Sequence, residues 1–124
     1  MEYEVFEKAI HRHKRETKLF VTIYKGTSPQ IGFSLPCAMW FEKQDAKKVQ
    51  YLWNSETKTM AFSPAPNGYA LHIKKTQAYV SAKLFLEYIG NPLAGRYKAT
   101  IDDSKKMIIV PLIDLESGSK PIQD

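Results

Sequence analysis

An internal similarity divides this chain, because residues 19–64 resemble residues 69–111 in the order of their apolar segments and turns. Three pairs of matching residues share a spacing of 47 positions: Ser34 with Ser81, Met60 with Met107, and Pro64 with Pro111. The first strand-like segments are 50 positions apart, which a longer turn in the first copy accounts for. A copy of about 45 residues is too small to bury an adequate core alone. Two copies are therefore expected to pack around a pseudo-twofold axis, as subunits of a symmetric dimer do.

Short apolar and β-branched segments, separated by Gly, Pro and charged turns, predict the same order of elements in both copies. Strands are expected at 19–24, 30–33, 49–53 and 59–63 in the first copy, and at 69–73, 78–80, 96–101 and 106–111 in the second. A short helix should follow the second strand of each copy, capped by the hydroxyl of Ser34 or Ser81. The predicted fold class is α+β, mainly β, with two ββαββ halves that form a small pseudo-twofold barrel or sandwich.

Apolar residues at helical spacing predict which face of each helix is buried. Cys37, Trp40 and Phe41 share one face of the first helix, and Cys37 is expected to be a small core residue. The expected apolar face of the second helix consists of Leu84, Phe85, Tyr88 and Ile89. The residues expected to be mostly buried come from both copies: Val21, Ile23, Trp40, Phe41, Leu52, Leu71, Ile73, Phe85, Ile89, Ile101 and Ile108.

Changes in composition divide the 124 residues into three parts. Residues 1–18 form an N-terminal arm with the densest basic run of the chain, at 11–15. The arm is either a short docking helix followed by a basic linker or a solvated terminus. Residues 19–115 are expected to form a single domain that contains both repeats, and residues 116–124 form a polar C-terminal tail.

The distribution of apolar residues argues against a membrane partner. They make up 44 % of the chain but occur in short segments, and none approaches the length that spans a bilayer. The first residues are acidic where a secretory signal carries basic residues, and no apolar run follows them. The single cysteine, Cys37, cannot form an internal disulfide. These features predict a cytoplasmic protein.

The motifs that would indicate enzymatic chemistry are missing from the sequence. Only His11, His13 and Cys37 could form a set of soft metal ligands, and structural zinc usually needs four. Neither a phosphate-binding glycine loop nor a Gly-x-Ser-x-Gly nucleophile elbow is present. The adjacent carboxylates Asp102 and Asp103 are typical of a turn. The sequence therefore predicts a non-enzymatic protein without cofactor or metal.

The charge distribution suggests a binding function instead. The formal net charge is +5, from 18 Lys and Arg against 13 Asp and Glu, which permits either nucleic acid or an acidic protein surface as a partner. Paired lysines stand at or near predicted turns, at 47–48, 74–75 and 105–106. Mobile cations that face one side can contact phosphates. The residues predicted to bind nucleic acid are Lys25, Lys74 and Lys75, with Arg12, Lys14 and Arg15 of the arm.

The first copy resembles a known DNA-binding module. Its segment 21–26 (VTIYKG), followed by 30–34 (QIGFS), a short helix and a strand hairpin, is similar to the swapped-hairpin module of AbrB/MazE-type proteins. The segment 44–49 carries the acidic residue of that family's pattern but lacks its glycine, and the first turn is longer. The resemblance implies two interlocked halves and a transcription regulator or antitoxin that binds DNA.

An alternative from a different functional class is a protein-interaction inhibitor or adaptor, encoded by a mobile element or phage and acting on a host nucleic-acid enzyme. The position of the lysines distinguishes the two hypotheses. Lysines gathered on one face favour DNA, whereas scattered lysines beside an exposed Tyr/Trp patch favour a protein partner. In either case the chain is expected to be a monomeric pseudo-dimer or a homodimer.

Overall fold

The computed structural model describes residues 17–112, which form a mainly β fold. Within this range, ten short strands form two five-stranded antiparallel sheets, accompanied by two helices. The expected α+β, mainly β class is therefore confirmed. The arm up to residue 16, with Arg12, Lys14 and Arg15, lies outside the described residues, as does the segment 113–124.

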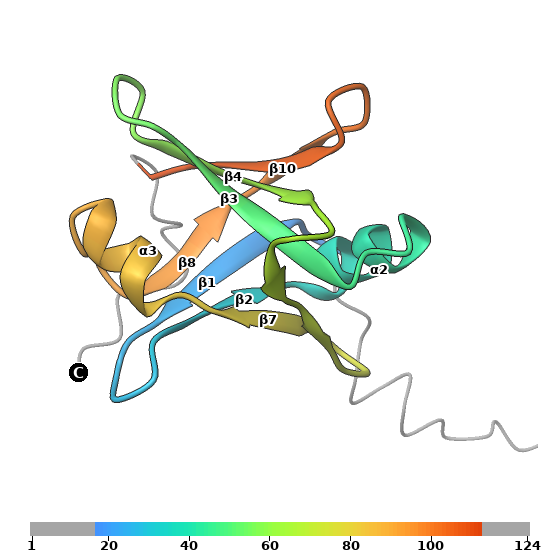
Figure 1. The fold of residues 1–124 in the computed structure, drawn as a ribbon, viewed down its shortest axis with the longest axis horizontal. Coiled ribbons are helices and arrows are strands. Elements are labelled where there is room, and N and C mark those ends of the chain that lie inside the picture. Colours follow the sequence, from blue (N-terminus) through green and yellow to red (C-terminus); the bar gives the residue numbers. More distant parts are fainter. Residues whose placement is uncertain (1–16, 113–124) are drawn as a thin grey trace, which may run out of the picture.

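The two sheets cross each other, and the helices lie at opposite ends (Figure 1). Sheet A has the strand order β6-β7-β2-β1-β8, with β1 (Phe20–Tyr24), β2 (Gln30–Phe33), β6 (His72–Ile73), β7 (Ala78–Ser81) and β8 (Gly95–Lys98). Sheet B has the order β5-β3-β4-β10-β9, with β3 (Lys48–Asn54), β4 (Thr59–Pro64), β5 (Tyr69–Ala70), β9 (Thr100–Asp102) and β10 (Met107–Pro111). Helix α2 (Leu35–Lys43) follows β2, and helix α3 (Lys83–Tyr88) follows β7.

Three phenylalanine rings join the two sheets and α2 into one core. Phe33 of β2 meets Phe62 of β4 with ring centroids 5.1 Å apart, and it meets Phe41 of α2 at 5.0 Å. Both contacts are edge-to-face, the geometry that adds about 0.5–1.5 kcal/mol to the burial of each aromatic pair. All three side chains are almost fully buried. The core therefore lies between the sheets.

Two segments pass from one sheet into the other, which corrects the prediction of single strands at 69–73 and 96–101. The chain runs from β5 in sheet B to β6 in sheet A through Leu71, and from β8 in sheet A to β9 in sheet B through Ala99. Both corner residues are buried, and their N–H groups donate to the carbonyls of Lys47 and Leu19 respectively. A bend at such a corner lets one strand pair with neighbours in two crossed sheets.

The prediction that the hydroxyls of Ser34 and Ser81 cap the two helices is wrong. Ser34 occupies the N-cap position of α2, but its side chain makes no capping bond and instead accepts a hydrogen bond from the N–H of Phe20 at 3.2 Å. Ser81 ends β7, and the N-cap of α3 is Ala82. The hydroxyl of Ser34 is thus used to tie the start of α2 to β1.

The buried faces of the helices are confirmed for α2 and only half confirmed for α3. Cys37, Trp40 and Phe41 are buried as expected. In α3, Phe85 is buried, whereas Leu84 and Tyr88 are 69 % and 75 % exposed. A helix of six residues has room for one buried stripe, so the apolar residues on its other side remain outside the core.

Seven of the eleven predicted core residues are buried: Val21, Ile23, Trp40, Phe41, Leu71, Phe85 and Ile108. The other four are half-buried: Leu52, Ile73, Ile89 and Ile101. Ile73 and Ile101 belong to the short strands that follow the sheet-to-sheet bends, and Ile89 follows the last turn of α3. Ile73 and Ile89 thus lie at the end of an element or just beyond it, whereas Leu52 and Ile101 lie within β3 and β9.

The hairpins β3–β4 and β9–β10 close with the same turn. In the first, the side chain of Asn54 accepts the N–H groups of residues 56 and 57; in the second, Asp102 accepts those of residues 104 and 105. Lys58 and Lys106 end these turns with φ of 54° and 56°. The spacing of the matching positions is 48, one more than the spacing that the sequence comparison indicates for this region.

Candidate nucleic-acid interface

The strand register places the predicted turn lysines at opposite ends of sheet A. Lys25 lies in the turn that precedes β2, and Lys74 and Lys75 lie in the turn that precedes β7. β2 and β7 are antiparallel neighbours, with Gln30 at the start of β2 opposite Ser81 at the end of β7. The structure therefore brings Lys74 and Lys75 together and places Lys25 apart from them (Figure 1).

A second lysine pair joins Lys74 and Lys75. Lys47 and Lys48 lead from α2 into β3, and the carbonyl of Lys47 accepts a hydrogen bond from the N–H of Leu71 at 3.0 Å. Residue 71 stands three positions before Lys74, at the base of the β6–β7 hairpin. We call the group formed by residues 47, 48, 74 and 75 the lysine end of the molecule.

The turn lysines differ in their surroundings. The Lys25 ammonium donates to the backbone carbonyl of Asn91 at 3.3 Å, in a surface hollow that also includes Lys83. The Lys74 ammonium lies 5.8 Å from the ring centroid of Tyr79, within the range of a cation–π contact. Lys75 is exposed on the same turn. All three side chains can reach a ligand from solvent.

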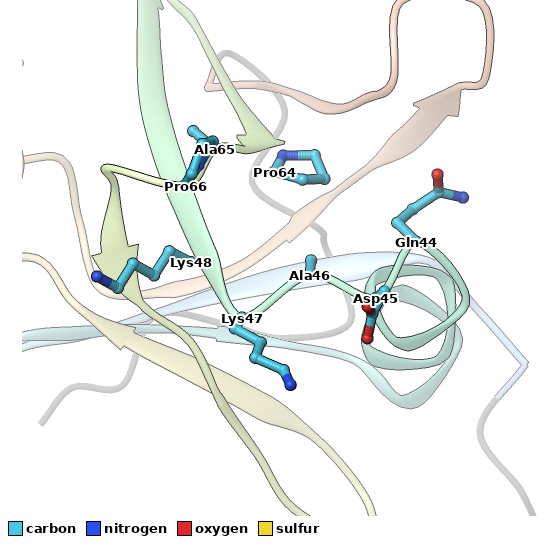
Figure 2. Close-up of a pocket in the computed structure, with 8 residues that line it drawn as sticks. All are labelled: Gln44, Asp45, Ala46, Lys47, Lys48, Pro64, Ala65 and Pro66. Atoms are coloured by element: carbon cyan, nitrogen blue, oxygen red, sulfur yellow. The ribbon is translucent and has the colours of Figure 1, made fainter.

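A hollow of about 400 Å³ opens beside Lys47 and Lys48 (Figure 2). Its other walls are residues 44–46, which follow α2, Pro64 at the end of β4, and residues 65–66 of the linker that follows. The carbonyl of Lys48 accepts the N–H of Ala65 at 3.0 Å, which fixes the linker to the start of β3. Figure 2 shows the two lysine side chains diverging, with the Lys48 ammonium beside β5. The hollow is therefore bordered by two lysines and by the carboxylate of Asp45, and its backbone is fixed.

An aromatic groove of about 680 Å³ adjoins this hollow along β3 and the same linker. It is lined by residues of β3, of the segment 67–69 and of α3: Gln50, Tyr51, Leu52, Trp53, Asn67, Gly68, Tyr69, Leu84, Phe85 and Tyr88. Tyr69 is 48 % exposed, and Leu84 and Tyr88 are more so. The hollow and the groove thus border successive residues of β3 and of the linker.

Tyr51 is the residue that holds this groove in shape. Its ring stacks on that of Tyr69, with centroids 4.4 Å apart and planes within 6°, and it contacts Phe85 at 4.8 Å. Its hydroxyl donates to the carbonyl of Ser81. Burial, and secondarily the neighbouring Tyr69, raises the pKa of Tyr51. The hydroxyl therefore stays protonated at neutral pH and acts as a donor.

Replacing Tyr51 with phenylalanine is expected to lower the free energy of unfolding by about 1 kcal/mol, because the hydrogen bond to Ser81 is lost while the ring contacts remain. Urea unfolding measures this change. The matched control is Tyr24→Phe, on a ring that is 40 % exposed, for which almost no change is expected. Equal stabilities of the Tyr51→Phe variant and the wild type would remove this hydrogen bond as an anchor of the groove.

Gly68 allows the linker to pass directly against β3. A Cβ atom at this position would lie 2.1 Å from the carbonyl oxygen of Val49 and 2.4 Å from its carbon. Both are backbone atoms of a central strand, so they cannot move aside without disturbing sheet B. The absence of a side chain here is what positions Tyr69 over Tyr51.

Among residues 17–112, His, Cys, Asp and Glu side chains form no group of three that could hold a metal ion. Burial raises the pKa of the Cys37 thiol, which is fully covered and contacts the backbone carbonyl of Phe20, so the reactive thiolate is disfavoured. No helix within the same residues is long and apolar enough to cross a membrane.

The aromatic groove is the part of this surface that the sequence did not reveal. Tyr69 was expected in an uninterrupted strand, and Leu84 and Tyr88 were expected in the core. A signal was present, since two apolar residues four positions apart on a very short helix compete with Phe85 and Leu86 for one buried face. Comparison with protein-family models, curated proteins and solved structures gave no match to the chain.

Proposed function

We propose that this protein is a small non-enzymatic nucleic-acid-binding protein of the transcription-regulator or antitoxin type. The observation that carries the proposal is the lysine end, where a backbone hydrogen bond between Leu71 and Lys47 brings the segments that carry two lysine pairs together from distant parts of the chain. The lysines are neither all on one face nor scattered, since four gather at one end and Lys25 stands at the other. A gathered set of mobile cations suits phosphate contact.

Charge and backbone geometry support this function. The chain carries a net charge of +5, which favours encounter with a polyanion. Hydrogen bonds of the Lys47 and Lys48 carbonyls hold the backbone at the start of β3, so the two side chains extend from a fixed base. Arg12, Lys14 and Arg15 of the arm would add further phosphate contacts to the same partner.

We infer that the chain is a duplicated ββαββ unit whose halves close into a pseudo-twofold barrel. Antiparallel pairing of equivalent strands supports this inference, because β2 pairs with β7 and β4 pairs with β10. The matching turns of the two hairpins support it as well. The bends at Leu71 and Ala99 lead the chain from one sheet to the other at both edges, as closure requires. A monomer would then be a pseudo-dimer, which sedimentation can test.

Neutralising the lysine end is expected to weaken the salt dependence of nucleic-acid binding. Each lysine that contacts a phosphate contributes roughly 0.9 to the slope of log K against log salt for duplex DNA, or roughly 0.7 for a single strand. Changing Lys47 and Lys48 together to alanine should remove two such contributions, and changing Lys74 and Lys75 should do the same. Titration of labelled DNA at several salt concentrations measures the slope.

The control for these pairs is Lys25→Ala, which removes one cation from the opposite end of sheet A, so its change of slope is compared with half of the change in each double variant. We expect a smaller change of slope for it than for either lysine pair. Absence of any binding at ~50 mM salt would contradict the proposed function, since even non-specific binders associate under that condition. Binding with an unchanged slope in both double variants would place the phosphate contacts elsewhere.

A protein partner is the second candidate, and the exposure of Leu84 and Tyr88 is the observation that favours it. Exposed apolar patches of this kind often mark interaction sites. The protein would then be an inhibitor or adaptor of a mobile element or phage, with the lysine end against an acidic surface of a host nucleic-acid enzyme. Affinity capture with and without nuclease treatment separates the two candidates, because a direct protein complex survives the nuclease.

A further inference from the structure

The aromatic groove presents ring faces to solvent next to a cation. We propose that it binds the unpaired bases of single-stranded nucleic acid, with one base stacked on Tyr69 and a neighbouring base against Tyr88, while Lys48 contacts the backbone phosphate. This inference rests on the proposed function and specifies its ligand class. Base–aromatic stacking is the main mode by which single strands are held without sequence preference.

Tyr69 has the properties of a stacking platform. One face of its ring is covered by Tyr51 in a nearly parallel stack, and the residue remains 48 % exposed. Tyr51 is itself fixed by Phe85, by an edge-to-face contact with Phe62 at 5.8 Å and by the hydrogen bond of its hydroxyl. The Tyr69 ring is therefore held flat before a ligand arrives, which lowers the entropic cost of stacking a base on its other face.

The second ring comes from a different element. Tyr88 of α3 borders the same groove and is 75 % exposed, so it is available to a second base without rearrangement of the core. Asn67 of the linker and Gln50 of β3 also line the groove. The Gln50 amide donates to the Ser63 hydroxyl at 3.2 Å, whereas the exposed Asn67 amide can hydrogen-bond a base edge. Two rings and an amide that border one groove fit a chain of successive bases.

One cation close to the rings along the ladder favours a polyanion for this surface. Lys48 pairs with Ala70, the residue directly after Tyr69, in the β3–β5 ladder. Side chains alternate along a strand, so Lys48 leaves β3 on the face opposite to Tyr69, and a nucleic-acid strand stacked on Tyr69 would meet it across the sheet edge. A duplex covers the faces of its bases by stacking within the helix, whereas a single strand can present them to aromatic side chains.

The test compares labelled single strands, oligo-dT and oligo-U, with a duplex of equal length, in titrations of the full chain at one salt concentration. We expect the single strands to bind more tightly than the duplex. Replacing Tyr69 or Tyr88 with leucine should weaken single-strand binding by roughly 5- to 150-fold each, the range that corresponds to 1–3 kcal/mol per stacked base. A further titration with oligo-dU, which differs from oligo-U only in the sugar, identifies whether the site prefers deoxyribose or ribose.

Two control variants keep the result specific to the rings. Tyr69→Phe retains the stacking face and should bind as the wild type does. Tyr24→Leu removes an exposed tyrosine of β1 that lies outside the groove, and it should also leave binding unchanged. Circular dichroism of each variant verifies that the fold is kept. Tyr88→Leu is the variant expected to disturb folding least, because Tyr88 is the most exposed of the substituted tyrosines.

Several outcomes would overturn the inference. Equal affinity for duplex and single strand, with the tyrosine-to-leucine variants unaffected, would reject the groove as a stacking site and leave the lysine end as the binding surface. Self-association that Tyr88→Leu abolishes, without any bound strand, would assign the groove to a second copy of the chain. Failure of every strand and duplex to bind at low salt would instead reject the proposed function itself, so the two failures are distinguishable.

Discussion

Replacing Phe62 with alanine is expected to lower the free energy of unfolding by about 3–5 kcal/mol, the usual range for a buried phenylalanine. Phe62 has no exposed surface, and its ring meets Phe33 of the opposite sheet and Tyr51 of the adjacent strand. The substitution removes these contacts and leaves a cavity between the sheets. Urea unfolding monitored by circular dichroism measures the change in stability.

Two further variants show whether the loss arises from the cavity. Phe62→Leu keeps most of the buried volume and should cost less than half as much as the alanine variant. Tyr88→Ala removes a ring of similar size from the surface and should change stability by less than about 0.5 kcal/mol. A loss of under about 1 kcal/mol for Phe62→Ala would place Phe62 outside the core and would contradict the crossed-sheet packing.

Replacing Gly68 with alanine is expected to destabilise the protein by about 1–3 kcal/mol, through crowding rather than through loss of contacts. The added methyl group would lie 2.1 Å from the Val49 carbonyl oxygen, so either β3 or the linker must move. Movement of the linker would lift Tyr69 from its stack on Tyr51. The same variant should therefore weaken binding of single strands, if the groove is the site.

The matched control is Asn67→Ala at the preceding position, where the side chain is exposed. Its expected effect on the free energy of unfolding is within about 0.5 kcal/mol. Wild-type stability of the Gly68→Ala variant would show that the linker does not approach β3 as closely as described. The thermal midpoint and the urea midpoint should agree on the order of the two variants.

Much of the local structure was readable from the sequence because its causes are local. Gln30–Phe33 was predicted at its observed bounds, and the turn at 54–58 was placed correctly. β-Branched and aromatic runs favour extended backbone, and Gly, Pro and Asx residues favour turns whatever the rest of the chain does. The burial of Cys37, Trp40 and Phe41 followed in the same way from helical spacing.

The errors concern features that depend on partners distant in sequence. Ser34 was expected to cap a helix through its side chain, but its hydroxyl oxygen accepts a hydrogen bond from the N–H of Phe20 instead. The segment 69–73 alternates like a single strand, yet its two halves pair with β3 and β7 in different sheets. No pattern within five residues can show which neighbour each half will meet.

The features of the candidate site also divide into those set by local sequence and those set by packing. The sequence by itself determined that the chain is mainly β, lacks recognised catalytic motifs, and carries its lysine pairs at turns, because composition and short-range pattern decide those properties. Only the tertiary structure decided that residues 47, 48, 74 and 75 share one end while Lys25 stands at the other, and that Tyr69 and Tyr88 remain at the surface. Those outcomes depend on strand register and on competition for a limited core, which are properties of the whole packed chain.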